Sequence, residues 1–341
     1  MEGTKVFWEN DHKTLRVNLV GRIDALTAKG LEKQVLGALE GLSNASCIVD
    51  AGKLGYIASA GIRILIELAN RCTTVKIIDV TRDIYDIFSM TGITNLMTVE
   101  RHIRSIQPPP PGMLLRKDPD GDVYRGTDEL AIKLFPAETS LEDVMYQWEL
   151  SRLAVSQGIP TPIAFEVVSC RDAYGMIFEN IHGKTLAQLY REQPDGITDE
   201  IRKLAALIRE LHHCHIAEGA LPDMDKRIRR ELEQSTVLSE NERLGLLRLM
   251  ESLQRKDAFV YGNLRLQNVL LQEGQLVLLD MTRCGRGSPV LDLQITASAL
   301  CADGHGEIWK QFFAVYTENV DPLTRDKMRK ILNPGLKPWW Q

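Results

Sequence analysis

The chain has 341 residues, of which 44% are hydrophobic and 26% are charged, so it is long enough for two domains with ordinary buried cores. Its net charge of -5 contains no block of basic residues, which disfavours nucleic acid and anionic membrane surfaces as partners. The chain shows neither a signal-peptide pattern nor a run of about eighteen apolar residues, and its six cysteines are widely separated, so we expect a reduced, cytoplasmic protein without membrane contact.

The segment before residue 107 alternates between strand and helix patterns. Leu15, Val17 and Leu19 repeat at period two, which predicts a strand. In chain order, the next predicted elements are a helix with an apolar face at Leu31, Val35, Ala38, Leu39 and Leu42, a buried strand at Cys47–Val49, a helix through Ile62, Leu65, Ile66 and Ala69, a strand at Val75–Val80 and a helix at Ile84–Met90. This order predicts an α/β module in which helices pack on a sheet.

A run of four prolines, Pro108–Pro111, separates this module from the rest of the chain. Proline cannot continue a helix and lacks a backbone donor, so the run favours an extended polyproline spacer. We therefore expect a first domain at 1–106, a linker at 107–112 and a second domain at 113–341.

Beyond the linker, strand patterns dominate to about Phe178, apart from one helix predicted at Leu141–Gln157. Helical patterns then dominate from Thr185 to the end of the chain. A small sheet-rich lobe followed by a larger helical lobe is a kinase-like order. The predicted fold class is therefore an α/β sandwich module followed by a bilobal, protein-kinase-like domain.

Small residues surround Ser59, where a strand must turn sharply into a helix. A phosphate on Ser59 would lie at the helix N-terminus, where unpaired backbone N–H groups and the helix dipole favour negative charge. Alternatively, Ser59 is only the N-cap of that helix, a role worth about 1 kcal/mol. Capping preference alone favours the second interpretation.

Two motifs of the first module resemble the STAS family of bacterial anti-sigma factor antagonists. They are Gly21-Arg22-Ile23-Asp24-Ala25 and the run from Val49 to Leu65, which contains Ala58-Ser59-Ala60-Gly61. The resemblance implies a protein-binding switch whose partner is an anti-sigma-type serine kinase or another signalling protein. The family motif runs Asp-Ser-Ser-Gly with the second serine as phosphate acceptor, so Ala60 fills the acceptor position here. Ser59, one position earlier, remains the phosphorylation candidate.

A single lysine, Lys133, lies among apolar residues of a predicted strand in the second domain. It is either a cation that reaches nucleotide phosphates or an exposed residue of an alternating strand. Glu149, on the following predicted helix, could pair with this lysine and fix its position, with Glu142 and Glu138 as rivals.

The stretch from Tyr261 to Leu271, the strand that ends at Asp280, and the run from Ser288 to Leu293 together resemble the aminoglycoside and choline kinase family. The family pattern is His-Gly-Asp-Leu-His-x-x-Asn-Ile-Leu, then an aspartate after an apolar strand, then Gly-x-Pro-x-x-Asp-Leu. The resemblance covers residues 113 to about 330. Asp292, in the last motif, is expected to be structural.

The family resemblance implies an ATP site with Mg²⁺. Lys133 would contact the phosphates and Glu149 would brace it. The connection between the lobes, at Glu179 and Ile181, would hold the adenine ring through its backbone. Asn268 and Asp280 would ligate Mg²⁺, which prefers hard oxygen donors of this kind.

Asn263 occupies the family's catalytic aspartate position, and Tyr261 and Arg265 replace its two histidines. A carboxamide can orient a hydroxyl group but cannot take its proton, and losing a general base typically lowers the rate about 10² to 10⁴-fold. Transfer would therefore be slow unless another acid, such as Asp257, substitutes.

Two altered chemical centres, Ala60 and Asn263, favour a bacterial signalling protein in which a STAS-like module is coupled to a nucleotide-binding pseudokinase. The alternative is an active ATP-dependent phosphotransferase that acts on a small-molecule or protein hydroxyl group. A purely structural adaptor is a third possibility, which the retained Lys133, Asn268 and Asp280 argue against.

Overall fold

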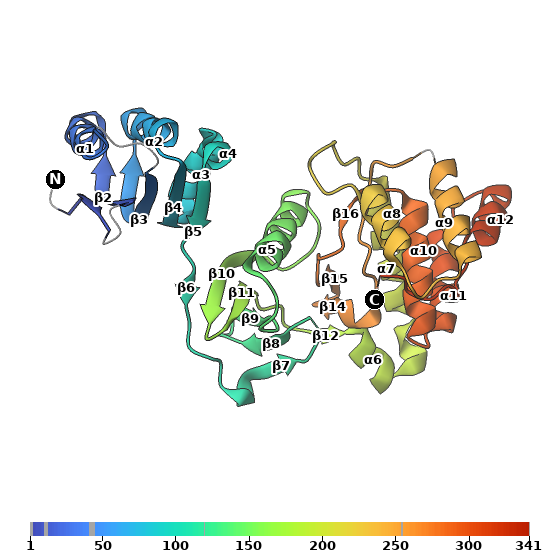
Figure 1. Ribbon diagram of the computed structural model, residues 1–341. Helices are drawn as coiled ribbons and strands as arrows, with labels where there is room; N and C mark the ends of the chain where they lie inside the picture. The colour runs from blue at the N-terminus through green and yellow to red at the C-terminus, as the bar shows by residue number, and fades with distance from the viewer. Residues whose placement is uncertain (1–2, 10–12, 41–44, 119, 254, 341) are drawn as a thin grey trace. The chain divides into compact units, whose positions relative to one another are not determined.

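The computed structural model describes residues 3–9, 13–40, 45–118, 120–253 and 255–340. Contacts between Cα atoms divide the chain into two compact units, Met1–Arg104 and Ser105–Gln341 (Figure 1). The predicted fold class, an α/β module followed by a bilobal kinase-like unit, is confirmed. Across the described ranges, no helix is long and apolar enough to cross a membrane.

The first unit is one five-stranded sheet with four helices. The strands follow the order β1 (Lys5–Trp8), β2 (Thr14–Ile23), β3 (Ser46–Ile57), β4 (Thr74–Val80) and β5 (Thr98–Arg101), and all neighbours except β1 and β2 run parallel. The helices are α1 (Ala25–Ala38), α2 (Ser59–Arg71), α3 (Arg82–Met90) and α4 (Ile93–Leu96). Val17, Val49 and Ile77 face one another on three adjacent strands and are almost fully buried, so the sheet centre is the core.

The predicted strands and helices of this unit are present, but β3 is much longer than the predicted Cys47–Val49. Gly52 and Gly55 make the later part of β3 look unlike a strand in sequence. Its backbone nevertheless pairs with β2 as far as Ile57, opposite Ile23. Of the predicted helix face, Leu42 lies outside the described residues.

The small lobe of the second unit is a six-stranded sheet with one helix. Its strand order is β6 (Arg104–Ser105), β10 (Ala164–Cys170), β11 (Ala173–Glu179), β9 (Leu130–Leu134), β8 (Asp122–Arg125) and β7 (Leu114–Arg116). Helix α5 (Leu141–Ser156) packs on β10 and β11 and matches the predicted helix closely. Its N-cap is Ser140, which accepts a hydrogen bond from the backbone N–H of Asp143.

The proline run leads into this lobe, and the residues on either side of it are structured. The Ile106 N–H donates to Ser169 O of β10 at 2.8 Å. Pro110 has φ -58° and ψ 142°, as expected for a polyproline conformation, and a short 3₁₀ turn, η1 (Pro111–Met113), follows.

The large lobe is mainly helical. Its helices are α6 (Leu186–Glu192), α7 (Thr198–His213), α8 (Met224–Gln234), α9 (Glu240–Ser252), α10 (Pro289–Ala302), α11 (Gly306–Tyr316) and α12 (Pro322–Ile331), with 3₁₀ turns η2 (Pro194–Ile197) and η3 (Leu266–Asn268). Two small sheets, β12 (Lys184–Thr185) with β14 (Val269–Gln272) and β15 (Gln275–Leu278), and β13 (Ala258–Val260) with β16 (Gly285–Gly287), support the loop that carries Asn263. Trp339, near the C-terminus, packs into the cluster formed by α8, α9 and α10.

Candidate functional site

The loop that carries Asn263 is anchored by a buried carboxylate. Asp292, at the start of α10, accepts hydrogen bonds from the backbone N–H of Tyr261 at 2.9 Å and from that of Gly262 at 2.8 Å. Its Oδ2 also contacts His212 Nε2 at 3.0 Å, and His212 Nδ1 lies 2.7 Å from the Tyr316 hydroxyl. Asp292 is only 2% exposed and does not line the cavity described below. Its contacts agree with the expected structural role.

Gly262 is required by the shape of this loop. Its φ is 68°, and an added Cβ would lie 2.5 Å from the backbone oxygen of Arg283. Arg283 in turn donates from Nε to Gly262 O at 3.0 Å and forms a two-pronged ion pair with Glu231 at 2.8 Å. The loop is therefore fixed from both sides, by Asp292 and by Arg283.

Tyr261 and Arg265, which replace the family's histidines, both have structural partners. The Tyr261 hydroxyl contacts the backbone oxygens of Asn268 and Leu279, and burial raises the pKa of this phenol well above its usual value. Arg265 Nη1 donates to Asp303 Oδ1 at 2.8 Å. Tyr261 thus contacts both the end of η3, where Asn268 lies, and the segment after β15 that carries Asp280.

Asn263 and Asp280 are in direct contact. The Asn263 amide nitrogen donates to Asp280 Oδ2 at 2.9 Å, and the backbone N–H of Thr282 donates to Asp280 Oδ1 at 3.1 Å. Asn268 is next to them, because its amide donates to Asn263 O at 3.1 Å and its backbone oxygen accepts from Leu279 N–H at 2.8 Å. The fold brings together the three positions predicted for base and metal.

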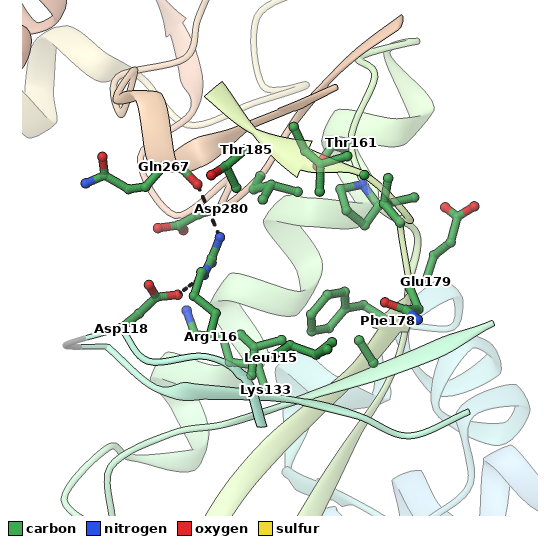
Figure 2. Close-up of a pocket in the computed structure, with 18 of the residues that line it drawn as sticks. Leu115, Arg116, Asp118, Lys133, Thr161, Phe178, Glu179, Thr185, Gln267 and Asp280 are labelled. Carbon is green, nitrogen blue, oxygen red and sulfur yellow. Dashed lines mark hydrogen bonds and ion pairs between the residues drawn. The ribbon is translucent and has the colours of Figure 1, made fainter. Parts of the chain in front are cut away.

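A cavity of about 610 Å³ lies between the two lobes of the second unit (Figure 2). In Figure 2, Arg116, Lys133 and Asp280 gather at one end, and Phe178 and Glu179 lie toward the other. The wall also includes apolar residues of both lobes, namely Leu115, Val123, Ala131, Met176, Leu270 and Leu279. An apolar slot that ends in charged groups is typical of a nucleotide site.

Lys133 and Arg116 of the small lobe line this cavity, and each is paired with a carboxylate. Lys133, only 6% exposed, contacts Asp120 through Nζ. Arg116 contacts Asp118 through Nε and reaches across the cavity to Gln267 O, to which Nη1 donates at 3.3 Å. The sequence analysis did not identify Arg116, Asp118 and Asp120 as site residues. The charged residues just before Gly121 in the β7–β8 connection could have indicated a charged group near the cavity.

The α5 face that meets the cavity does not carry Glu149. Gln147 and Ser151, one turn apart, line the cavity with Lys133, whereas Glu149 is exposed and is not among the lining residues in the described part of the chain. The Gln147 side-chain oxygen is buried and has no hydrogen-bond partner among the described residues. The α5 residues that line the cavity are therefore neutral.

Glu179 and Ile181, expected to hold the adenine ring, both line the cavity. The surrounding connection is fixed to the small lobe: Asn180 N–H donates to Glu129 O at 2.8 Å, and His182 Nε2 contacts Asp128 O at 2.7 Å. A rigid backbone at this place suits recognition of a flat base edge.

The chemistry of these residues fits Mg²⁺ and a nucleotide. Asp280 keeps free lone pairs beyond its two accepted hydrogen bonds, and the Asn268 side-chain oxygen supplies a second hard donor. Lys133 and Arg116 match phosphate charge. Asp257, by contrast, contacts His215 and Arg255, which lower its carboxyl pKa, and it does not line the cavity. It is therefore not placed to substitute for the base.

In the first unit, Ser59 is exposed and is the first residue of α2. The interpretation of Ser59 as the N-cap is wrong, because the N-cap is Ala58, with φ -94° and ψ 172°. Ala58 has no side-chain oxygen, so the first turn of α2 has no side-chain cap. A capping preference in sequence cannot fix the helix start to one residue.

Comparison with known families confirms both predicted resemblances. Residues 115–330 match the phosphotransferase enzyme family, and residues 8–99 match the Mlab, STAS domain family. No curated protein matches the chain.

Several solved structures resemble the chain at low identity. An ADP-bound aminoglycoside phosphotransferase, APH(2'')-Ib, is 17% identical, with a TM-score of 0.45 over 63% of this chain and 80% of that one. An aminoglycoside-3'-phosphotransferase of type VIII is 18% identical, with a TM-score of 0.47 over 64% and 91%. A choline/ethanolamine kinase family protein from Mesorhizobium loti is 15% identical, with a TM-score of 0.45 over 64% and 74%.

Proposed function

Because this chain belongs to the phosphotransferase enzyme family and joins that domain to a STAS domain, we propose that it is a signalling protein whose second unit binds ATP with Mg²⁺ but transfers phosphate poorly. The observation that carries the proposal is the contact between the Asn263 amide and Asp280, a residue of the cavity wall.

The residues of the cavity divide the work of nucleotide binding. Lys133 and Arg116 supply positive charge for the phosphates, and the apolar wall around Phe178 receives the base. Asp280 and Asn268 would hold Mg²⁺, which neutralises phosphate charge when bound.

Asn263 cannot act as the general base that phosphate transfer requires at its position. A general base accepts a proton from the attacking hydroxyl group, and a carboxamide nitrogen has no lone pair for it. The Asn263 amide instead donates to Asp280, so its oxygen can at most orient a hydroxyl group.

The STAS unit would bind the signalling partner. Its exposed Ser59 lies at the uncapped start of α2, where free backbone N–H groups favour a phosphate. An anti-sigma-type serine kinase, or another signalling protein that reads this surface, is the proposed partner.

Calorimetric titration of the full chain with ATP, with and without Mg²⁺, tests the binding part, and measurement of phosphate transfer to a panel of alcohols and proteins tests the catalytic part. We expect Mg²⁺-dependent ATP binding and turnover about 10² to 10⁴-fold below an ordinary kinase. An ordinary turnover rate would instead identify the chain as an active ATP-dependent phosphotransferase.

A further inference from the structure

Lys133 has a carboxylate partner in the β7–β8 connection. Its Nζ contacts Asp120, two residues before β8, while the α5 residues that share the cavity with it, Gln147 and Ser151, are neutral. A buried ammonium group needs an acceptor or an opposite charge, and Asp120 supplies both for Lys133.

The same connection also neutralises a second cation of the cavity. Arg116 contacts Asp118, so two of the cavity's small-lobe cations, Lys133 and Arg116, each contact a carboxylate between β7 and β8. Asp118 lines the cavity, and Asp120, which is not among the lining residues, contacts the Lys133 ammonium group from the same connection.

Bound phosphate and Asp120 cannot both contact the Lys133 ammonium group without strong repulsion between their negative charges. The side chain of Asp120 is 45% exposed, whereas that of Lys133 is 8% exposed, so the aspartate is the partner that can turn out to solvent. Gly121 follows with φ 141°. An added Cβ at Gly121 would lie 2.7 Å from Leu134 O and 3.1 Å from Lys133 Cε, so only glycine allows this close approach.

We propose that Asp120 is an autoinhibitory residue, whose ion pair with Lys133 closes the phosphate end of the cavity and is exchanged for an ion pair with nucleotide phosphate on binding. The inference rests on the nucleotide-binding function proposed above. The contact stabilises only the empty state, so it lowers the affinity for phosphate-bearing ligands and leaves the affinity for a nucleoside unchanged.

The test is calorimetric titration of the full chain and its Asp120→Asn variant with ATP, ADP and adenosine. We expect the variant to bind ATP and ADP about tenfold more tightly, because a half-buried ion pair no longer competes, and to bind adenosine with unchanged affinity. The matched control is Asp122→Asn at the first residue of β8, whose carboxylate contacts the Tyr124 hydroxyl at 3.4 Å rather than a cation and should not affect these affinities.

If the wild type binds ATP and ADP, and Asp120→Asn binds them with the same affinity, the autoinhibitory role of Asp120 is wrong. The nucleotide-binding proposal would still stand. An equal gain for adenosine would also overturn the autoinhibitory role, because the gain would then not depend on phosphate. If neither protein bound any of the three ligands, the nucleotide-binding proposal itself would fail.

Amide hydrogen exchange of the wild-type chain gives a second test that needs no variant. We expect ADP to speed exchange at residues 120–122 while it protects the amides around Asp280, and adenosine to leave residues 120–122 unchanged. Protection of residues 120–122 by ADP would contradict the exchange of partners.

Discussion

The Asn263 amide nitrogen lies 2.9 Å from Asp280 Oδ2 and donates a hydrogen bond to it. A carboxylate at residue 263 would instead place two negative charges at this distance, and they could remain ionised together only with a cation between or beside them. Asn263 therefore stabilises the site in the absence of metal. It also removes the group that would accept a proton.

Asn263→Asp should restore turnover and make the site depend on Mg²⁺. We expect phosphate transfer to rise about 10² to 10⁴-fold if the missing base limits the rate. Without Mg²⁺ the variant should melt at a lower temperature than the wild type, because its two carboxylates repel each other. Steady-state turnover and melting with and without Mg²⁺ measure both effects. Asn263→Ala is the control, and equal activity in the two variants would show that another group limits transfer.

Asp280→Asn should remove the Mg²⁺ dependence of ATP binding. An amide is a much weaker Mg²⁺ ligand than a carboxylate, so the affinity for ATP should become the same with and without Mg²⁺. Calorimetric titration in Mg²⁺ and in EDTA measures this difference. Asp303→Asn is a suitable control, since Asp303 pairs with Arg265 and does not line the cavity. Mg²⁺ dependence that survives in Asp280→Asn would place the metal elsewhere.

Asp292→Asn should destabilise the second unit without acting on the ligand directly. The substitution replaces one acceptor oxygen by an amide group that faces the N–H of Tyr261 or Gly262 and weakens the contact with His212. We expect the free energy of unfolding to fall by about 2 to 4 kcal/mol. Urea unfolding followed by tryptophan fluorescence measures it, because four of the five tryptophans lie beyond residue 105. A loss below about 0.5 kcal/mol, typical of surface substitutions, would contradict the buried role.

Local patterns of the sequence predict most elements, whereas the residues of the Asn263 loop were identified from the resemblance to the aminoglycoside and choline kinase family. The apolar face of α2 and the helix at Leu141–Gln157 follow from periodicity, because both helices bury one side on a sheet. Asn263, Asn268 and Asp280 could be brought together because a short hairpin, β14 with β15, returns the chain within a few residues. Short-range geometry of this kind is encoded locally.

The partner of Lys133 could not be predicted in this way. Glu149 and Gln147 both lie on α5, and the rotation of that helix against β10 and β11 decides which of them meets the cavity. Large hydrophobic side chains also lie on the exposed side of α5, at Tyr146 and Leu153, so the apolar pattern does not indicate the rotation. Asp120 reaches Lys133 through a turn with a glycine at φ 141°, and a turn of this kind is not specified by periodicity.

Stability of the second unit should fall as the pH rises above 9. Burial raises the pKa of Cys284 to about 12, and it raises the pKa of Tyr261 well above 10. In the unfolded chain the thiol ionises near pH 9 and the phenol near pH 10, whereas both stay protonated in the fold. The stabilisation is therefore complete below pH 9 and is lost progressively as the pH approaches 12.

Urea unfolding between pH 8 and pH 11 measures this dependence. Each group contributes a slope of up to about 1.4 kcal/mol per pH unit within its window. Cys284→Ala should flatten the slope most near pH 9, where the thiol of the unfolded chain is ionising and its phenol is still mostly protonated. A slope that is the same in both proteins would mean that Cys284 is not buried as its environment indicates.

Ala58→Ser should stabilise the first unit by supplying the side-chain cap that α2 lacks. The backbone of Ala58 is extended, as an N-cap requires, so a serine there can accept from an N–H of the first turn. We expect α2 to gain about 0.5 to 2 kcal/mol, whereas Ser59→Ala should change its stability little. Amide exchange across residues 59–71 of the full chain reports the local stability. If Ser59→Ala lost as much as Ala58→Ser gained, Ser59 would act as a cap after all, and its hydroxyl group would be less available for phosphorylation.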